Sequence, residues 1–141
     1  DTFISLDLED DLLVVGQSRA GSDDSGRATI YERGANGTWD LKQMLRPRVP
    51  YEDGAFGSVV SFSGDAVLIA GYDEQLQKNF NIDRVVYEFT RPSGEEDWTQ
   101  RRIFDVGIVT FGYAIAASTG IAVIGKASDG QPGAAYVVQI Q

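Results

Sequence analysis

Residues 5–16 read SLDLEDDLLVVG, and residues 114–125, AIAASTGIAVIG, align with them without a gap. A third copy lies between them at residues 56–71, FGSVVSFSGDAVLIAG, and fits with one extra residue. The glycines that close the copies are therefore 55 and then 54 positions apart, at Gly16, Gly71 and Gly125. A fixed period of this length indicates a repeat architecture, and it decides how the rest of the sequence is interpreted.

Each copy predicts two antiparallel strands joined by a tight turn. An apolar run follows each polar turn pair: Glu9-Asp10, Gly64-Asp65 and Thr119-Gly120. Two-residue hairpins favour such pairs, because Gly and Asp tolerate a positive φ. A third strand is predicted at Ala28–Tyr31, Val85–Phe89 and Ala135–Val138.

A fourth strand is predicted to begin at each tryptophan, over Trp39–Leu45 and Trp98–Phe104. The tryptophan and the last apolar residue are six positions apart in both, so we expect them on the same face of the strand. Four short antiparallel strands per unit, repeated at a fixed period, are typical of the blades of a β-propeller.

The repeats resemble a known family. Phe56-Gly57 and Phe111-Gly112 open units, a Gly-Asp turn precedes an apolar strand ending in glycine, and residues 133–138 read GAAYVV. These features are similar to FG-GAP repeats, the blades of the β-propeller of integrin α-subunits and of many secreted repeat proteins. The resemblance implies an all-β fold of three FG-GAP-like, four-stranded antiparallel blades, part of a β-propeller. The blades are expected at about residues 1–47, 54–104 and 109–141.

The sequence also departs from the FG-GAP pattern. The Gly-Ala-Pro triplet is replaced by Gly16-Gln17-Ser18, Gly71-Tyr72-Asp73 and Gly125-Lys126-Ala127, and the third unit stops before a tryptophan-initiated fourth strand. An incomplete array leaves bare apolar faces and an unpaired strand edge. We therefore expect that the chain is not an isolated monomer, and that a further segment or another chain supplies a strand beside Ala135–Ile140. A larger parent or complex is favoured over a simple homodimer.

Composition narrows the possible functions. The chain has no Cys and no His, which excludes thiolate catalysis, Ser-His-Asp triads and the usual zinc sites. Its net charge of −9 disfavours binding to nucleic acid or to anionic membranes, and no apolar run is long enough to span a bilayer. Paired carboxylates remain as an acid–base route, at Asp23-Asp24, Asp73-Glu74 and Glu95-Glu96-Asp97. We interpret these pairs as solubilising loop residues, and predict that the protein is not an enzyme.

The family resemblance suggests one metal, calcium. Calcium-binding FG-GAP blades carry acidic residues in the loop between their first two strands, and the corresponding candidates here are Asp7, Glu9 and Asp11. The stretch is too short to wrap a cation with six to eight oxygens, so a solvated acidic hairpin is the favoured interpretation. No cofactor is predicted. Asn36-Gly37-Thr38 matches the N-glycosylation pattern, but Asn-Gly is also a favoured turn pair.

Large aromatic residues recur at corresponding positions of the repeats. Trp39 and Trp98 could stack on sugar rings, yet recurring large residues in repeats usually fill the seam between units. We expect seam packing for both tryptophans, and also for Phe56 and Phe111. The long connections at Gln17–Gly26, Tyr72–Asp83 and Arg46–Ala55 are expected at one end of the blades. Partner contacts should concentrate on the first two of them, because long loops on a rigid scaffold usually carry function.

These features favour a non-enzymatic interaction or structural module of an extracellular or lumenal assembly. The chain begins at Asp1 without a signal-like segment, so we expect a processed or excised piece whose targeting segment is not present. Two alternatives stay open: an accessory propeller domain of an enzyme complex, and a carbohydrate-binding propeller. The expected partners are other protein chains or further blades of a longer parent.

Overall fold

The computed structural model describes residues 3–78, 81–107, 110–128, 130 and 132–140, and for residues 74–78, 81 and 82 it describes the backbone only. These residues form strands and no helix, so no described segment could cross a membrane as a helix. The strands are β1 (Ile4–Glu9), β2 (Leu12–Gln17), β3 (Arg27–Arg33), β4 (Trp39–Leu45), β5 (Val60–Ser63), β6 (Ala66–Lys78), β7 (Asn81–Thr90), β8 (Thr99–Phe104), β9 (Phe111–Ser118), β10 (Ile121–Lys126) and β11 (Ala134–Gln139).

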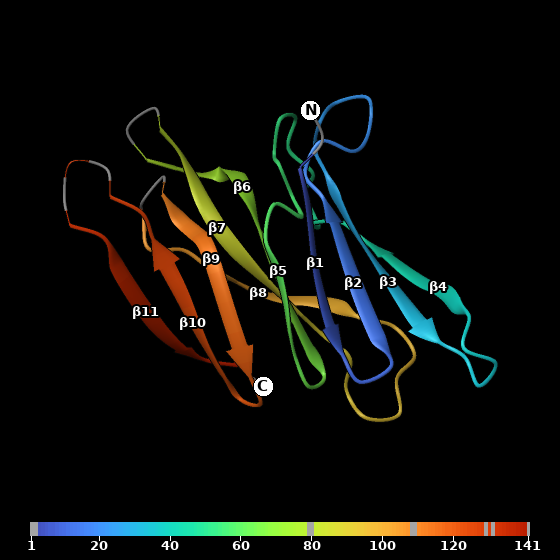
Figure 1. Cartoon of the computed structure of the whole chain (residues 1–141). Coiled ribbons are helices and arrows are strands. Elements are labelled where there is room, and N and C mark those ends of the chain that lie inside the picture. The colour runs from blue at the N-terminus through green and yellow to red at the C-terminus, as the bar shows by residue number, and fades with distance from the viewer. Residues whose placement is uncertain (1–2, 79–80, 108–109, 129, 131, 141) are drawn as a thin grey trace.

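The strands form three antiparallel sheets, each made from one contiguous stretch of chain. The first sheet has the order β1-β2-β3-β4, the second β5-β6-β7-β8, and the third β9-β10-β11. Figure 1 shows the three sheets next to one another, with the second in the middle and β1, β5 and β9 as neighbours. The all-β prediction and the sheets of four, four and three strands are confirmed, and the described sheets form an open array.

Each sheet contains a two-residue hairpin, and two of the three predicted turn pairs are confirmed. Ser63 pairs with Ala66 across Gly64-Asp65, and Ser118 pairs with Ile121 across Thr119-Gly120. In the first sheet Glu9 pairs with Leu12, so the turn is Asp10-Asp11, one residue later than predicted. Asp10 adopts a φ of 53°, which an aspartate in a tight turn tolerates.

A bulge in each fourth strand overturns the expectation that the tryptophan and the last apolar residue share a face. Ile30 pairs with Gln43 while the next residue, Tyr31, pairs with Leu41, so β4 carries an extra residue at Lys42. Leu45 therefore points into the core and is 2% exposed, whereas Trp39 points away from it and is 38% exposed. β8 has the same kind of bulge between its pairs with Glu88 and Phe89.

The predicted long loop at Tyr72–Asp83 is wrong over most of its length. β6 continues to Lys78 and β7 begins at Asn81, with Tyr72 opposite Arg84 and Asp73 opposite Asp83. The apolar run that marked the strand ends at Gly71, but backbone pairing continues into the polar residues beyond it. The tip of this hairpin, residues 79 and 80, lies outside the described residues.

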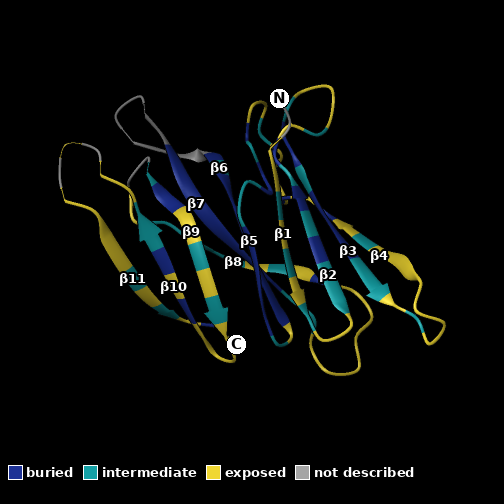
Figure 2. Ribbon diagram, in the orientation of Figure 1, coloured by how far each residue is buried: buried dark blue, intermediate teal, exposed yellow. Residues whose placement is uncertain are grey.

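Two apolar layers hold the sheets together (Figure 2). The layer between the first and second sheets contains Val14, Ala28, Ile30, Leu45, Phe56, Val60, Phe62, Val67, Ile69, Val85, Tyr87, Phe89 and Trp98. The layer between the second and third sheets contains Leu68, Ala70, Val86, Phe111, Ala122, Ile124 and Ile140. The seam positions predicted for Phe56, Phe111 and Trp98 are confirmed, because each is at most 1% exposed in one of these layers.

The first layer is closed at one end by a close backbone approach. A Cβ at Gly16 would lie 2.1 Å from the carbonyl oxygen of Gly57, and Gly57 itself has a φ of 91°. The connection from β4 to β5 thus crosses the end of the first sheet in contact with its backbone, and Phe56 N–H donates to the Ser25 carbonyl at 3.0 Å. Only glycine fits at these two positions.

The two tryptophans provide a matched test of the packing. Trp98 is 1% exposed between two sheets, whereas Trp39 lies on an outer face with Arg33 over its ring. Trp98→Ala should lower the free energy of unfolding by about 3–5 kcal/mol because it opens a cavity in the first layer. Trp39→Ala should cost less than about 1 kcal/mol. Urea denaturation of both variants and of the unmodified chain at one fixed protein concentration measures the losses, and equal losses would contradict the assigned packing.

Candidate interaction sites

The interface between the first and second sheets, here called the first seam, has polar side chains of β1 along the edge where β1 meets β5. Val14 is the partner of Asp7 across the hairpin, so Asp7 shares the face that meets the second sheet. Its carboxylate accepts the backbone N–H of Phe62 at 2.8 Å, and Glu9 accepts the N–H of Gly64 at 2.7 Å. The Ser5 hydroxyl oxygen accepts the N–H of Val60 at 3.1 Å. Alternate side chains of β1 therefore accept the backbone N–H groups that β5 and its turn leave without a partner in their own sheet.

A second set of hydrogen bonds joins the two sheets at the opposite edge of the first seam, where β4 meets the start of β8. The side-chain amide of Gln43 donates to the Trp98 carbonyl at 2.9 Å and accepts the Trp98 N–H at 2.7 Å. The bulge in β4 places Gln43 on the face that meets the second sheet. Farther along, the Arg48 backbone N–H donates to the Gln100 side chain at 2.8 Å. The first two sheets are thus joined at both edges as well as through the apolar layer.

The seam between the second and third sheets uses different chemistry at its edges. The Ser63 hydroxyl donates to the Ser118 carbonyl, and Arg102 donates both to the buried carboxylate of Glu88 and to the Gln139 carbonyl. Counted from the turns, Ser63 corresponds to Glu9, so a serine contacts the third sheet where a carboxylate contacts the second. Ser61 corresponds to Asp7, but its hydroxyl donates to Asp7 itself in the first seam at 3.3 Å.

The three calcium candidates serve separate structural contacts. Asp7 and Glu9 accept backbone N–H groups of the second sheet, and Asp11 pairs with Arg33 at 2.7 Å. The structure does not bring the three carboxylates together around one point, and within the described ranges no group of three acidic side chains could hold a metal ion. The solvated acidic hairpin expected from the sequence is also wrong for Asp7 and Glu9, since both are half-buried in the seam.

Chelation tests this assignment. Because Asp7 and Glu9 already accept protein N–H groups, we expect EDTA to leave the melting temperature of the chain unchanged. A bound ion stabilises a native state by mass action, so its removal lowers the melting temperature. A fall of several degrees in EDTA that calcium reverses would contradict the assignment.

Truncation of Asp7 should weaken the first seam. Asp7→Ala leaves the Phe62 N–H without its partner, and the loss of a hydrogen bond to a charged group should cost about 1.5–3 kcal/mol of unfolding free energy. Asp11→Ala is the matched control, because it removes an exposed ion pair worth no more than about 1 kcal/mol. Chemical denaturation of both variants measures the difference, and a larger loss for the control would overturn the role given to Asp7.

The glycosylation candidate lies where an acceptor is accessible. Asn36 is exposed in the connection between β3 and β4, and its side-chain oxygen accepts both the N–H and the hydroxyl of Thr38 at 3.1 and 2.7 Å. Gly37 follows with a φ of 81°. The residue pattern thus forms a local turn that leaves Asn36 on the surface, and glycosylation stays a prediction.

The outer face of the first sheet is apolar across all four strands. Two rows of cross-strand neighbours run over it: Leu6, Val15, Thr29 and Met44 in one, and Leu8, Leu13, Tyr31 and Leu41 in the other. Leu6, Leu8 and Leu41 are each more than half exposed. Trp39 lies on the same face, so the seam position expected for it is not present in this chain.

The outer face of the third sheet is a second exposed apolar surface. Val123 pairs with Ala116 on one side and Val137 on the other, and Ile121 lies two residues from Val123 in β10, on the same face. Val137 is 66% exposed, and Ile121 and Val123 are each more than 40% exposed. Both ends of the open array therefore present apolar sheet faces. Figure 2 shows exposed residues on the strands at both sides of the array.

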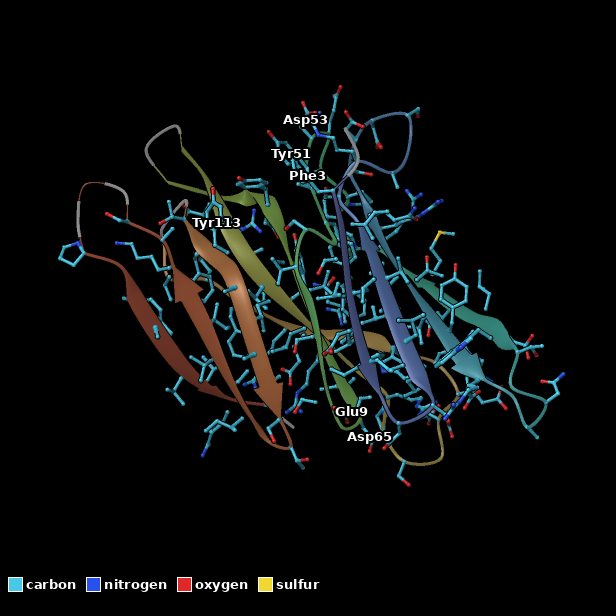
Figure 3. All side chains as sticks on the ribbon, in the orientation of Figure 1. Phe3, Glu9, Tyr51, Asp53, Asp65 and Tyr113 are labelled. Atoms are coloured by element: carbon cyan, nitrogen blue, oxygen red, sulfur yellow. The ribbon has the colours of Figure 1, made fainter. Side chains whose placement is uncertain are left out.

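A cavity of about 610 Å³ lies at the end of the sheets that carries the long connections. Phe3, Asp53 and Tyr113 are found at that end in Figure 3, opposite the turn end marked by Glu9 and Asp65. The lining residues are Phe3, Ser18, Arg19, Asp24, Asp53, Ala55, Ser58, Val59, Tyr72, Arg84 and Tyr113. The sequence pointed to Gln17–Gly26 and Tyr72–Asp83, and of these Ser18, Arg19, Asp24 and Tyr72 line the cavity. It missed Arg84, whose only signal was a basic residue at the start of an apolar strand.

Comparison with known proteins adds no relationship. No protein-family model matches the chain, and no curated protein matches it at a significant level.

Proposed function

We propose that the chain is a sector of a β-propeller, built from FG-GAP-like blades, that serves as a non-enzymatic interaction or structural module of an extracellular or lumenal assembly. The observation that supports this function is the pair of exposed apolar sheet faces at the two ends of the array. Each face takes a further β-sheet of the same kind, supplied by a longer parent chain or by a partner chain.

The repeat indicates what covers the first outer face. Leu12 and Ala66 each follow a two-residue turn, so Leu13 and Val15 correspond to Val67 and Ile69 of the second sheet. Val67 and Ile69 are fully buried against the first sheet. The outer face of the first sheet is therefore the counterpart of a face that already receives a sheet within this chain.

The third sheet presents the opposite kind of face. Ile121 follows a turn in the same way, so Val123 corresponds to Val14 of the first sheet. Val14 is fully buried against the second sheet, whereas Val123 is 41% exposed. The two ends of the array thus carry unlike, complementary faces, and unlike faces associate head to tail. Such contacts close into a ring or extend a stack.

Charged substitutions on the two faces test the proposed association. The purified chain should self-associate, because its own copies are the only sheets of this kind in solution, and light scattering should give a mass above 15.3 kDa. Leu8→Glu on the first sheet and Val137→Glu on the third should each reduce the association. Asn36→Asp adds a charge in an exposed loop away from both faces and should leave it unchanged.

Mixing the two face variants separates head-to-tail association from other kinds. Each variant keeps one intact face, and the two intact faces are of opposite kinds. An equimolar mixture should therefore form a dimer that neither variant forms alone. A cooperatively folding monomer of the unmodified chain, or a mixture that stays monomeric, would contradict the proposal.

A further inference from the structure

The floor of the cavity is formed by a buried arginine. Arg84 is in β7, opposite Tyr72 in the ladder with β6, and only 6% of it is exposed. Tyr72 is held in place because the Tyr87 hydroxyl donates to its carbonyl at 3.1 Å. Burial and the neighbouring Asp73 carboxylate raise the pKa of Tyr87 far above its usual value, so this hydroxyl keeps its proton.

The charge of Arg84 has no counter-ion in the part of the chain that the structure describes. Its Nη2 donates to the Ser58 hydroxyl at 2.7 Å and to the Gly112 carbonyl at 3.2 Å, both neutral acceptors. Its Nε is buried without a hydrogen-bond partner. Buried charges in proteins are normally paired, because desolvation of an isolated charge is costly. A buried guanidinium that lines a cavity and has no counter-ion among the described residues therefore indicates an anionic ligand.

The walls of the cavity indicate an organic ligand rather than an inorganic one. The Arg84 guanidinium carbon lies 4.6 Å from the ring centroid of Tyr113 and 5.6 Å from that of Tyr72. Tyr113 is 53% exposed. Phe3 and Val59 add apolar surface. An exposed aromatic face beside a fixed charge suits a ligand that has an apolar face next to its anionic group.

The rim of the cavity limits the charge of the ligand. Asp24 lies 3.7 Å from Arg19, and the exposed Asp53 also lines the cavity. These carboxylates accept hydrogen bonds from hydroxyl groups but repel a second negative charge, as does the net charge of −9. Asp24, Asp53 and Ala55 all hold a positive φ, and residues in this conformation often cluster at binding sites.

We propose that the cavity binds a small hydroxylated carboxylate, of which a uronic acid is the simplest example. Its carboxylate pairs with Arg84, its hydroxyls donate to Asp24 and Asp53, and one face of its ring stacks on Tyr113. The site uses strand residues of the second and third sheets and residues of the segments that flank β1, β2 and β5, and it is separate from the outer faces that carry the proposed assembly.

Titration of the chain with glucuronate, followed by backbone NMR, tests the site. Glucuronate should bind with a millimolar dissociation constant and shift the amide signals of Arg84 and Tyr113. Glucose, which lacks the carboxylate, should bind at least about tenfold more weakly, since the charge-assisted pair is lost. Inorganic phosphate should also bind more weakly than glucuronate. Glucose equal to glucuronate, phosphate tighter than glucuronate, or no binding of glucuronate would each overturn the proposal.

Variants locate the binding. Arg84→Gln should weaken glucuronate binding by about tenfold or more. Because Arg84 is buried and this variant could fold poorly, Tyr113→Ala provides a second test at an exposed position, with a smaller loss of severalfold. Arg101→Gln, at the turn end of the sheets, is the matched control and should bind glucuronate like the unmodified chain. Unchanged binding in Tyr113→Ala, or an equal loss in the control, would show that the ligand binds elsewhere.

Discussion

The arrangement of the sheets depends on the contact between the polar side chains of β1 and the free edge of β5. An edge strand exposes backbone N–H groups that need partners, and here Ser5, Asp7 and Glu9 supply them from the neighbouring sheet. Each side chain meets the backbone of the residue 55 positions later. This contact fixes the distance and the register of the two sheets, and the apolar layer fills the space that it leaves.

The same constraint accounts for where the chain can interact. Each seam covers one apolar face of each of its two sheets, so the two seams cover four of the six faces and leave one at each end of the array. Their exposure is not an accident of individual residues, since Val15 and Val123 occupy positions whose counterparts are buried in the neighbouring sheets. The cavity at the loop end follows from the same geometry, because strands of the second and third sheets and the connections of the first sheet meet there.

Local patterns in the sequence predicted the strands and the three antiparallel sheets well, and contacts between sheets were predicted poorly. The turn pairs and apolar runs gave the hairpins and the strand order, because these depend on neighbours along the chain. The bulge at Lys42 left no clear sequence signal, and it reverses the face of Trp39 relative to Leu45. The roles of Asp7 and Arg84 depend on partners 55 and 26 residues away, which no local pattern encodes.

Amide hydrogen exchange at the edge of β5 tests the central contact most directly. Phe62 and Gly64 direct their N–H groups away from β6 and toward Asp7 and Glu9. If the first two sheets are joined as described, these two amides exchange slowly, at rates set by opening of the seam. Exchange as fast as that of an unprotected edge strand would show that β1 does not cap β5, and that the sheets are not held in this register.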